Sequence, residues 1–325
     1  MNIISKKENR MKNRFLVSLI TIPIISNAAL LPAINSKGGA MVLPEGKLKA
    51  EIKHINFDRK NMFEGKNEVK NKENLNATAN ITTVGLYYGI NKKSTVGAII
   101  PYKNIRASAT LGANAVEIDN KGIGDVLLIA RHVILPMSSY GYQLSIDGGI
   151  KLPTGATNGS FKKAPNVANG VNTPMPTQMG TGEFEYKLGA GVSYMIDDSW
   201  RIDTHAMYTY RPKAHNDYDF GDEILLDLST TKAVTKQVNI GIEYNFSYNT
   251  KTDMGNDTNA ALRALLPFKA FSGNAGYVTP QVEWVPFGKP KIHFGFGVSF
   301  LSNYDLKEYQ PLEKRRFLFR MGYLF

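Results

Sequence analysis

The chain has no cysteine among its 325 residues, which excludes disulfide frameworks, thiolate zinc sites and cysteine nucleophiles together. It also lacks any run approaching about 18 apolar residues, so a membrane protein built from helices is excluded. The five histidines do not have metal-ligand spacing, and neither HExxH nor G-x-S-x-G is present. We therefore predict no catalytic, cofactor-binding or metal site.

The sequence has no block of like charge, although its formal net charge is +11. Five basic residues and one acidic residue lie within residues 1–28, which accounts for +4 and leaves +7 spread over the remainder. A nucleic-acid-binding protein gathers its basic residues on one face or along one segment. The charge distribution therefore does not indicate a nucleic-acid partner.

The first 28 residues have the pattern of a secretory signal peptide. A basic start precedes the apolar stretch from Phe15 to Ile25, and small residues follow up to a cleavage site after Ala28. The apolar stretch is too short to span a bilayer as a helix, and either Met1 or Met11 fits as the start. We predict a signal peptide over 1–28, a short periplasmic segment over 29–46, and one domain over 47–325.

Most of that domain alternates apolar with polar or small residues at period two, which is typical of β-strands. In residues 140–152, for example, Leu144 and Ile146 alternate with Gln143 and Ser145. The pattern predicts twelve strands, over 47–57, 78–91, 94–105, 122–135, 138–152, 182–197, 199–212, 219–231, 235–248, 274–286, 290–303 and 313–325.

The predicted connections alternate in length along the chain. The short ones lie at Asn91–Lys93, Pro136, Asp197–Asp198, Lys232 and Gly288, and the longer ones at 58–77, 106–121, 153–181, His215, 249–273 and Tyr304. A closed outer-membrane barrel has long external loops and short periplasmic turns, whereas a soluble β-sandwich has no reason to sort its loops in this way. We therefore expect an all-β fold, a closed antiparallel transmembrane β-barrel.

The end of the chain favours a membrane location for this barrel. Phe317, Phe319 and Met321 share one face of the last strand with Tyr323 and the terminal Phe325. A last strand ending in this way resembles the insertion signal of bacterial outer-membrane barrels. We therefore expect the protein in the outer membrane of a Gram-negative cell, with membrane lipid and the barrel-assembly machinery as partners.

Several short motifs, in order, are similar to those of a known group of proteins. They are LPEGK (43–47), YGI (88–90), IPY (100–102), GIGDV (122–126), KLPTG (151–155), GTGEFEY (180–186) and YVTPQVEW (277–284). From about Leu43 to Phe325 the chain resembles the putative MetA-pathway of phenol degradation family of porin-like outer-membrane proteins. The resemblance implies a barrel that passes small molecules, often hydrophobic or aromatic ones, and it implies no catalytic residue.

The polar face of the strands is predicted to line the lumen. Its candidate residues are Lys49, Lys53, Lys151, Glu183, Glu185, Lys187, Arg201, Asp203, His205, Glu223, Asp227, Glu243, Glu283, Arg316 and Arg320. Barrel closure places the acidic Glu243 and Glu283 in one sector and the basic Lys49, Arg316 and Arg320 in another. These sectors either impose a field across a pore or neutralise each other and fill the barrel.

The function predicted from these features is a passive or loop-gated channel for small solutes. Loop 153–181 is a candidate constriction, residues 29–46 are a candidate plug of the periplasmic side, and 260–270 is a candidate short helix. One alternative is a structural or surface-interaction barrel with a filled lumen. Another is an outer-membrane phospholipase using His132 with Ser138 or Ser139.

Overall fold

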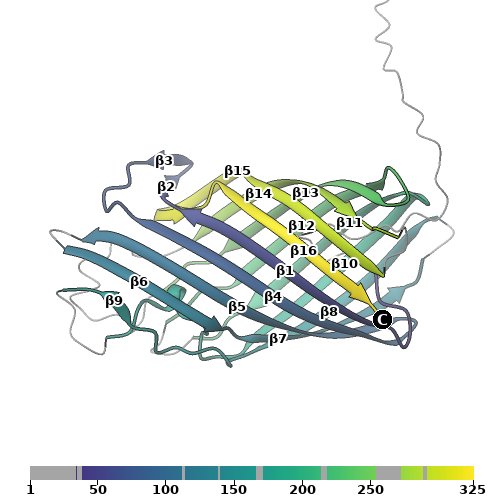
Figure 1. Ribbon diagram of the computed structural model, residues 1–325, viewed down its shortest axis with the longest axis horizontal. Coiled ribbons are helices and arrows are strands. Elements are labelled where there is room, and N and C mark those ends of the chain that lie inside the picture. The colour runs from purple at the N-terminus through teal and green to yellow at the C-terminus, as the bar shows by residue number, and fades with distance from the viewer. Residues whose placement is uncertain are drawn as a thin grey trace, which may run out of the picture.

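The alternating segments form strands of one antiparallel ring in the computed structural model (Figure 1). The structure describes residues 34, 39–111, 114–137, 140–165, 171–213, 218–253, 272–287 and 291–325. The ring consists of β1 (Leu48–Arg59), β4 (Asn76–Asn91), β5 (Ser94–Leu111), β7 (Val126–Leu135), β8 (Tyr142–Leu152), β10 (Glu185–Asp197), β11 (Trp200–Tyr210), β12 (Glu223–Ala233), β13 (Val238–Asn249), β14 (Gly273–Trp284), β15 (Ile292–Leu312) and β16 (Arg315–Leu324).

Each strand of the ring pairs with its neighbours, and the last strand closes it against the first. Lys53 of β1 lies opposite Thr83 of β4 on one side and Arg320 of β16 on the other. Because every edge is paired, no row of backbone donors and acceptors remains open along the ring. The predicted closed barrel of twelve antiparallel strands is confirmed. Within the described residues, no helix has both the length and the apolar character needed to cross a membrane.

The two faces of the barrel wall have opposite character, as β11 illustrates. Arg201, Asp203 and His205 are buried on the inner face, whereas Tyr208 and Tyr210 are 44% and 50% exposed on the outer face. Other strands likewise carry exposed leucine, isoleucine, valine and phenylalanine on the outside. A wall that is apolar outside and polar inside is the arrangement that lipid requires, and it is the reverse of a soluble barrel.

Pairing extends beyond the ring in places where the sequence predicted loops. The predicted loop 106–121 is wrong, because β5 continues to Leu111 and pairs with β6 (Asn114–Ile123). The predicted connection around Tyr304 is also wrong: β15 runs on to Leu312 and pairs there with β2 (Asn61–Gly65), which pairs with β3 (Asn67–Val69). The reason is that a partner strand supplies hydrogen bonds to the backbone N–H and C=O groups even where the side chains no longer alternate clearly.

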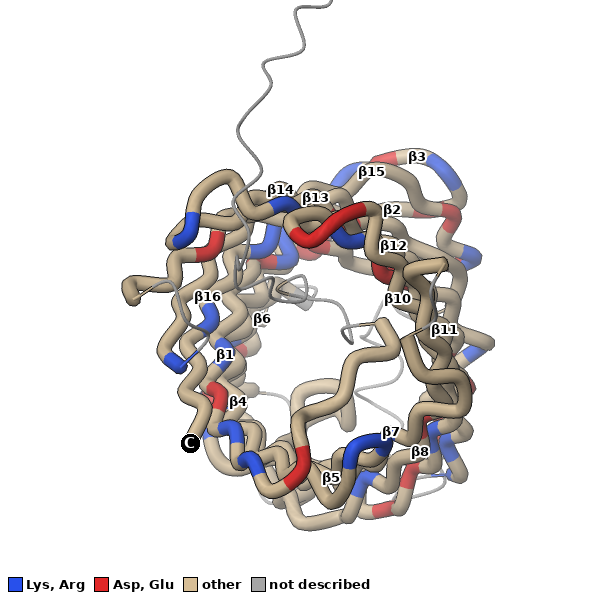
Figure 2. Tube along the Cα trace, turned by 90° about the vertical axis from the view of Figure 1, so that its right-hand side faces the viewer, with Lys and Arg blue, Asp and Glu red and all other residues tan. Residues whose placement is uncertain are grey.

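We call one end of the barrel the turn end, because short connections such as 92–93 and 198–199 lie there, as does Phe325. The other end, the loop end, carries β2, β3, β6 and β9 (Phe161–Lys163), on the left of Figure 1. Figure 2 looks onto the turn end and shows the closed ring with chain inside it. The predicted signal peptide, the predicted helix over 260–270, and the positions of Ser138, Ser139, His215 and Gly288 lie outside the described residues.

Candidate functional site: the barrel lumen

The N-terminal segment, of which Ile34 and residues 39–46 are described, lies inside the turn end. The backbone N–H of Ala40 donates to Ser193 Oγ at 2.9 Å, and Gln143 Nε2 donates to the Ala40 carbonyl at 2.8 Å. The N–H of Leu43 donates to Thr95 Oγ1 at 2.8 Å. These partners come from the inner faces of β10, β8 and β5, so the segment is bonded to the wall from several sides.

Two inner-face glycines make room for this segment. A Cβ at Gly191 would collide with the carbonyl of Gly39, and a Cβ at Gly89 would collide with that of Pro44. Ile34 is 1% exposed, and its N–H donates to Gln281 Oε1 of β14. The inward glycines therefore accommodate chain inside the lumen, as required for the predicted plug of this end.

Ion pairs occupy the turn half of the lumen. Arg320 of β16 pairs with Glu283 of β14, and both are 1% exposed. These residues are two strands apart, but each lies opposite Gly295 of β15, which has no side chain to separate them. Among the two alternatives left by the sequence, this pairing favours neutralisation between the acidic and basic sectors over a field across an open pore.

Further pairs of acidic and basic side chains lie on the inner face around the ring. Glu51 lies 2.5 Å from Lys49 Nζ and 3.5 Å from Lys53 Nζ, and Arg201 Nε lies 2.8 Å from Asp203. Asp147 of β8 pairs with Arg131 at 2.5 Å and also contacts His205 Nε2. Sequence reasoning did not select Glu51, Arg131 or Asp147, although each occupies a polar-face position of its strand. No cluster suited to a metal ion is found in the described part of the chain.

The predicted lumen residues differ in their exposure. Seven are buried: Glu185, Arg201, Asp203, His205, Glu243, Glu283 and Arg320. Lys49, Lys53, Lys151, Lys187, Glu223, Asp227 and Arg316 are half-buried on inner-face positions. Glu183 differs from the prediction, because it precedes β10 and its side chain is exposed. The proposed insertion signal, with Tyr323 packed edge-on against Phe325, stays a prediction.

The loop half of the lumen contains a cavity of about 580 Å³. Its lining is largely apolar, and we call it the chamber. The apolar lining comprises Phe57, Leu75, Ala77, Ala79, Ile81, Ile105, Ala107, Ala109, Val116, Ile118, Phe161, Pro174, Pro176, Tyr218, Phe220, Ala275, Leu306, Pro311 and Leu312. Pockets of roughly 300–1,000 Å³ hold small ligands.

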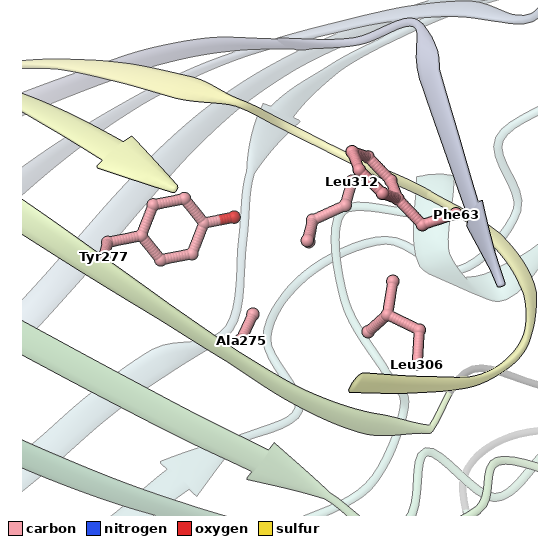
Figure 3. Packing of buried hydrophobic residues seen from close by; sticks show 5 residues of the cluster. All are labelled: Phe63, Ala275, Tyr277, Leu306 and Leu312. Carbon is pink, nitrogen blue, oxygen red and sulfur yellow. The ribbon is translucent and has the colours of Figure 1, made fainter. Parts of the chain in front are cut away.

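A hydrophobic cluster lies behind part of the chamber lining, to which it contributes Ala275, Leu306 and Leu312. Phe63 of β2 packs with Tyr277 and Ala275 of β14 and with Leu306 and Leu312 of β15 (Figure 3). The β2–β3 hairpin, part of the long connection after β1, is thus folded against the barrel rather than away from it. β2 pairs here with the last residues of β15, from Leu306 to Leu312.

Charged side chains form the polar part of the chamber lining. Glu313, 1% exposed, lies 2.6 Å from both Arg59 and Arg316. Arg316 also lies over the ring of Tyr277, with 3.6 Å to its centroid. Arg211 Nη2 lies 2.8 Å from Glu223. Arg59, Arg211 and Arg316 therefore each have a carboxylate partner.

The long loop 153–181 lies against the chamber and is tied to the barrel by Asp125, which links β6 and β7. The Asp125 carboxylate accepts the N–H groups of Gly155 and Thr181, both at 2.9 Å, and Lys151 Nζ at 2.8 Å. Pro174, which precedes the 3-10 turn η1 (Met175–Thr177), and Pro176 within it both line the chamber. The described part of the loop is therefore positioned as the predicted constriction requires.

Replacing Asp125 with Asn should release this loop. Burial alone would raise the pKa of Asp125, but Lys151 and the two N–H donors outweigh burial and lower the pKa. The charged contacts between Asp125 and the loop are therefore present above a pH of about 4, and they are lost as the pH falls through the lowered pKa. Hydrogen exchange of residues 155–181 should become at least about tenfold faster in the variant at neutral pH, because charged hydrogen bonds are lost.

The matched control is Asp119→Asn, which removes a 38% exposed carboxylate paired with Arg106 on the β5–β6 hairpin. Its exchange in the loop should equal that of the wild type. Equal exchange in the Asp125 variant would mean that the loop is held by its other contacts.

The histidine considered for hydrolysis lies on the outer wall. His132 Nδ1 lies 3.0 Å from Ser94 Oγ, and the two residues are direct cross-strand partners on β7 and β5. Within the described residues, no carboxylate contacts the other ring nitrogen of His132. Since strand register alone accounts for this pair, the geometry gives no specific support to a hydrolase.

Residues 63–302 match the family described as "Putative MetA-pathway of phenol degradation", which covers about three quarters of the chain. The chain belongs to this family. The resemblance indicated by the short motifs is thereby confirmed. No curated protein sequence matches the chain.

The fold is similar to that of the COG4313 outer membrane channel from Pseudomonas putida F1, with a TM-score of 0.65 at 13% identity over 89% of this chain and 99% of that one. The Pseudomonas putida toluene transporter TodX has a TM-score of 0.44 at 8% identity, over 87% of this chain and 91% of that one. The CymD monoaromatic hydrocarbon channel has a TM-score of 0.41 at 10% identity, over 87% of this chain and 88% of that one. The first similarity identifies the barrel fold.

Proposed function

We propose that this family member is an outer-membrane channel for small apolar solutes, aromatic ones included. The chamber is the observation that carries this proposal. In a barrel whose turn half is filled by ion pairs, a cavity of about 580 Å³ lined mainly by apolar side chains gives an apolar solute a place to leave water. The apolar outer wall supports the membrane location.

In this proposal the channel is closed at rest at both ends. The N-terminal segment closes the turn end, which faces the periplasm, and loop 153–181 covers the external mouth. A solute enters when the loop moves, occupies the chamber, and leaves when the N-terminal segment moves or when the wall opens.

Filling the chamber tests this function. Ala107 of β5 lines the chamber, and Ala107→Trp should occupy much of it. Cells of a Gram-negative host that degrade toluene and express the wild type should consume it faster at low concentration than cells without the protein. The variant should return consumption to that background.

Ala98→Trp on the same strand is the matched control, because Ala98 shares the lipid-facing side with Val96 and Ile100. This control should consume toluene like the wild type, at equal amounts of folded protein in the outer membrane. Equal consumption by the Ala107 variant would contradict the proposed function.

The filled turn half specifically favours a second candidate, a structural barrel with no transport. It predicts that wild-type protein and both tryptophan variants leave toluene consumption at the background level.

A further inference from the structure

One cation in the chamber differs from the others. Arg59, Arg211, Arg316 and Lys103 all line the chamber, and the three arginines are paired with carboxylates. Lys103 of β5 forms no ion pair among the described residues. Its Nζ donates to the carbonyl of Met179 in loop 153–181 at 2.7 Å.

The carboxylates nearest to Lys103 are already paired with another lysine. The cross-strand partners of Lys103 are Ile81 on β4 and Gly122 on β6. The carboxylates of Asp125 and Glu185 are near enough to act on Lys103 electrostatically, but both are already paired with Lys151. An ammonium group has three N–H donors, and the bond to Met179 uses one of them.

Lys103 lies in a mostly apolar lining with one hydrogen bond and no carboxylate of its own among the described residues, and a half-buried ammonium is stabilised when a further acceptor meets its remaining donors. We propose that Lys103 binds the carboxylate of a small organic acid whose apolar, preferably aromatic, body occupies the chamber. This inference rests on the proposed function and defines its substrate class: amphipathic monocarboxylates rather than neutral hydrocarbons alone.

The position of Lys103 suits this role. The residue bridges the chamber wall and the loop that covers the mouth, so a carboxylate bound there also lies beside the Met179 carbonyl contact. The remaining N–H donors of the ammonium can bind the acid group, and charged acceptors form the stronger hydrogen bonds. One ammonium can therefore hold both the acid group and the loop at Met179.

The test compares benzoate with benzamide, which has nearly the same shape without the charge. Wild-type protein in lipid nanodiscs is dialysed to equilibrium against each radiolabelled compound, and binding to empty nanodiscs is subtracted. The wild type should bind benzoate at least about tenfold more tightly than benzamide, because one charged hydrogen bond contributes that much.

Lys103→Gln keeps an N–H donor for the Met179 carbonyl but removes the charge. Benzoate affinity should fall at least about tenfold in this variant, and benzamide affinity should stay unchanged. Lys93→Gln is the matched control in the exposed turn between β4 and β5, and it should bind both compounds like the wild type. Lys103→Met provides a second uncharged variant if the first does not fold.

Equal affinities for the two compounds in the wild type, or unchanged benzoate affinity in the folded Lys103 variants, would overturn the inference. If toluene consumption still depends on Ala107 in that case, the proposed channel function stands without the acid specificity. If benzoate binding depends on Lys103 but toluene consumption does not depend on Ala107, the chamber binds acids and the transport proposal fails.

Discussion

Removal of residues 29–46 is expected to convert a silent barrel into a conducting one. The described part of this segment is bonded to inner-face side chains of β5, β7, β8, β10 and β14. In planar bilayers the intact protein should show no discrete channel events, and the truncated protein should show them. The events should be small, because ion pairs such as Arg320 with Glu283 still occupy the lumen.

A double substitution in the barrel wall tests whether displacement of residues 29–46, without their removal, also opens the channel. Ser193→Ala combined with Gln143→Ala removes both side-chain partners of Ala40. Each neutral hydrogen bond contributes about 1 kcal/mol, so the two together should raise the open probability roughly thirtyfold. The barrel should still migrate as a folded, heat-modifiable band on a gel.

Deletion within loop 153–181 is the matched control for the truncation. Because the turn end remains closed, this deletion alone should leave the bilayer silent. Combined with loss of residues 29–46, it should increase the size of each event. A truncated barrel that stays silent while folded would mean that the ion pairs alone close the lumen, and it would favour the structural candidate.

The strands were predictable because each carries its own signal. In β11, for example, Arg201, Asp203 and His205 lie on one face and Trp200, Ile202 and Tyr208 on the other, and this period-two pattern is independent of what lies beside the strand. The alternation of long and short connections along the chain then predicted that these strands close into a barrel. The β5–β6 extension was missed because residues such as Ala107, Ser108 and Ala109 alternate only weakly, and because its stability comes from pairing.

The lumen was less predictable because its contacts depend on register between strands. Glu283 and Arg320 were assigned to opposite sectors, and only the shared position opposite Gly295 shows that they meet. Lys103 was missed for a related reason. Its inner-face position follows from the alternation around Ile99 and Ile105, but the missing carboxylate partner is a property of the assembled chamber.

Glu313 gives the clearest energetic consequence of such contacts. Burial alone would raise its pKa, but Arg59 and Arg316 outweigh burial and lower the pKa to about 2. Because the folded pKa lies below the unfolded value, the stabilisation is complete above a pH of about 4.5 and is lost as the pH falls toward 2.

Glu313→Ala should therefore destabilise the barrel by about 3 kcal/mol at neutral pH, because it leaves two arginines at the chamber without their partner. Urea unfolding of the detergent-solubilised or bilayer-embedded protein measures this difference, and the variant should also lose part of the acid dependence of the wild type.

Glu68→Ala is the matched control. It removes the 43% exposed partner of Lys314, and because exposed pairs contribute little, the change should stay within about 1 kcal/mol. Equal unfolding midpoints for the two variants would mean that water replaces Glu313 at both arginines, and that the loop end of the lumen is wetter than the burial of this carboxylate implies.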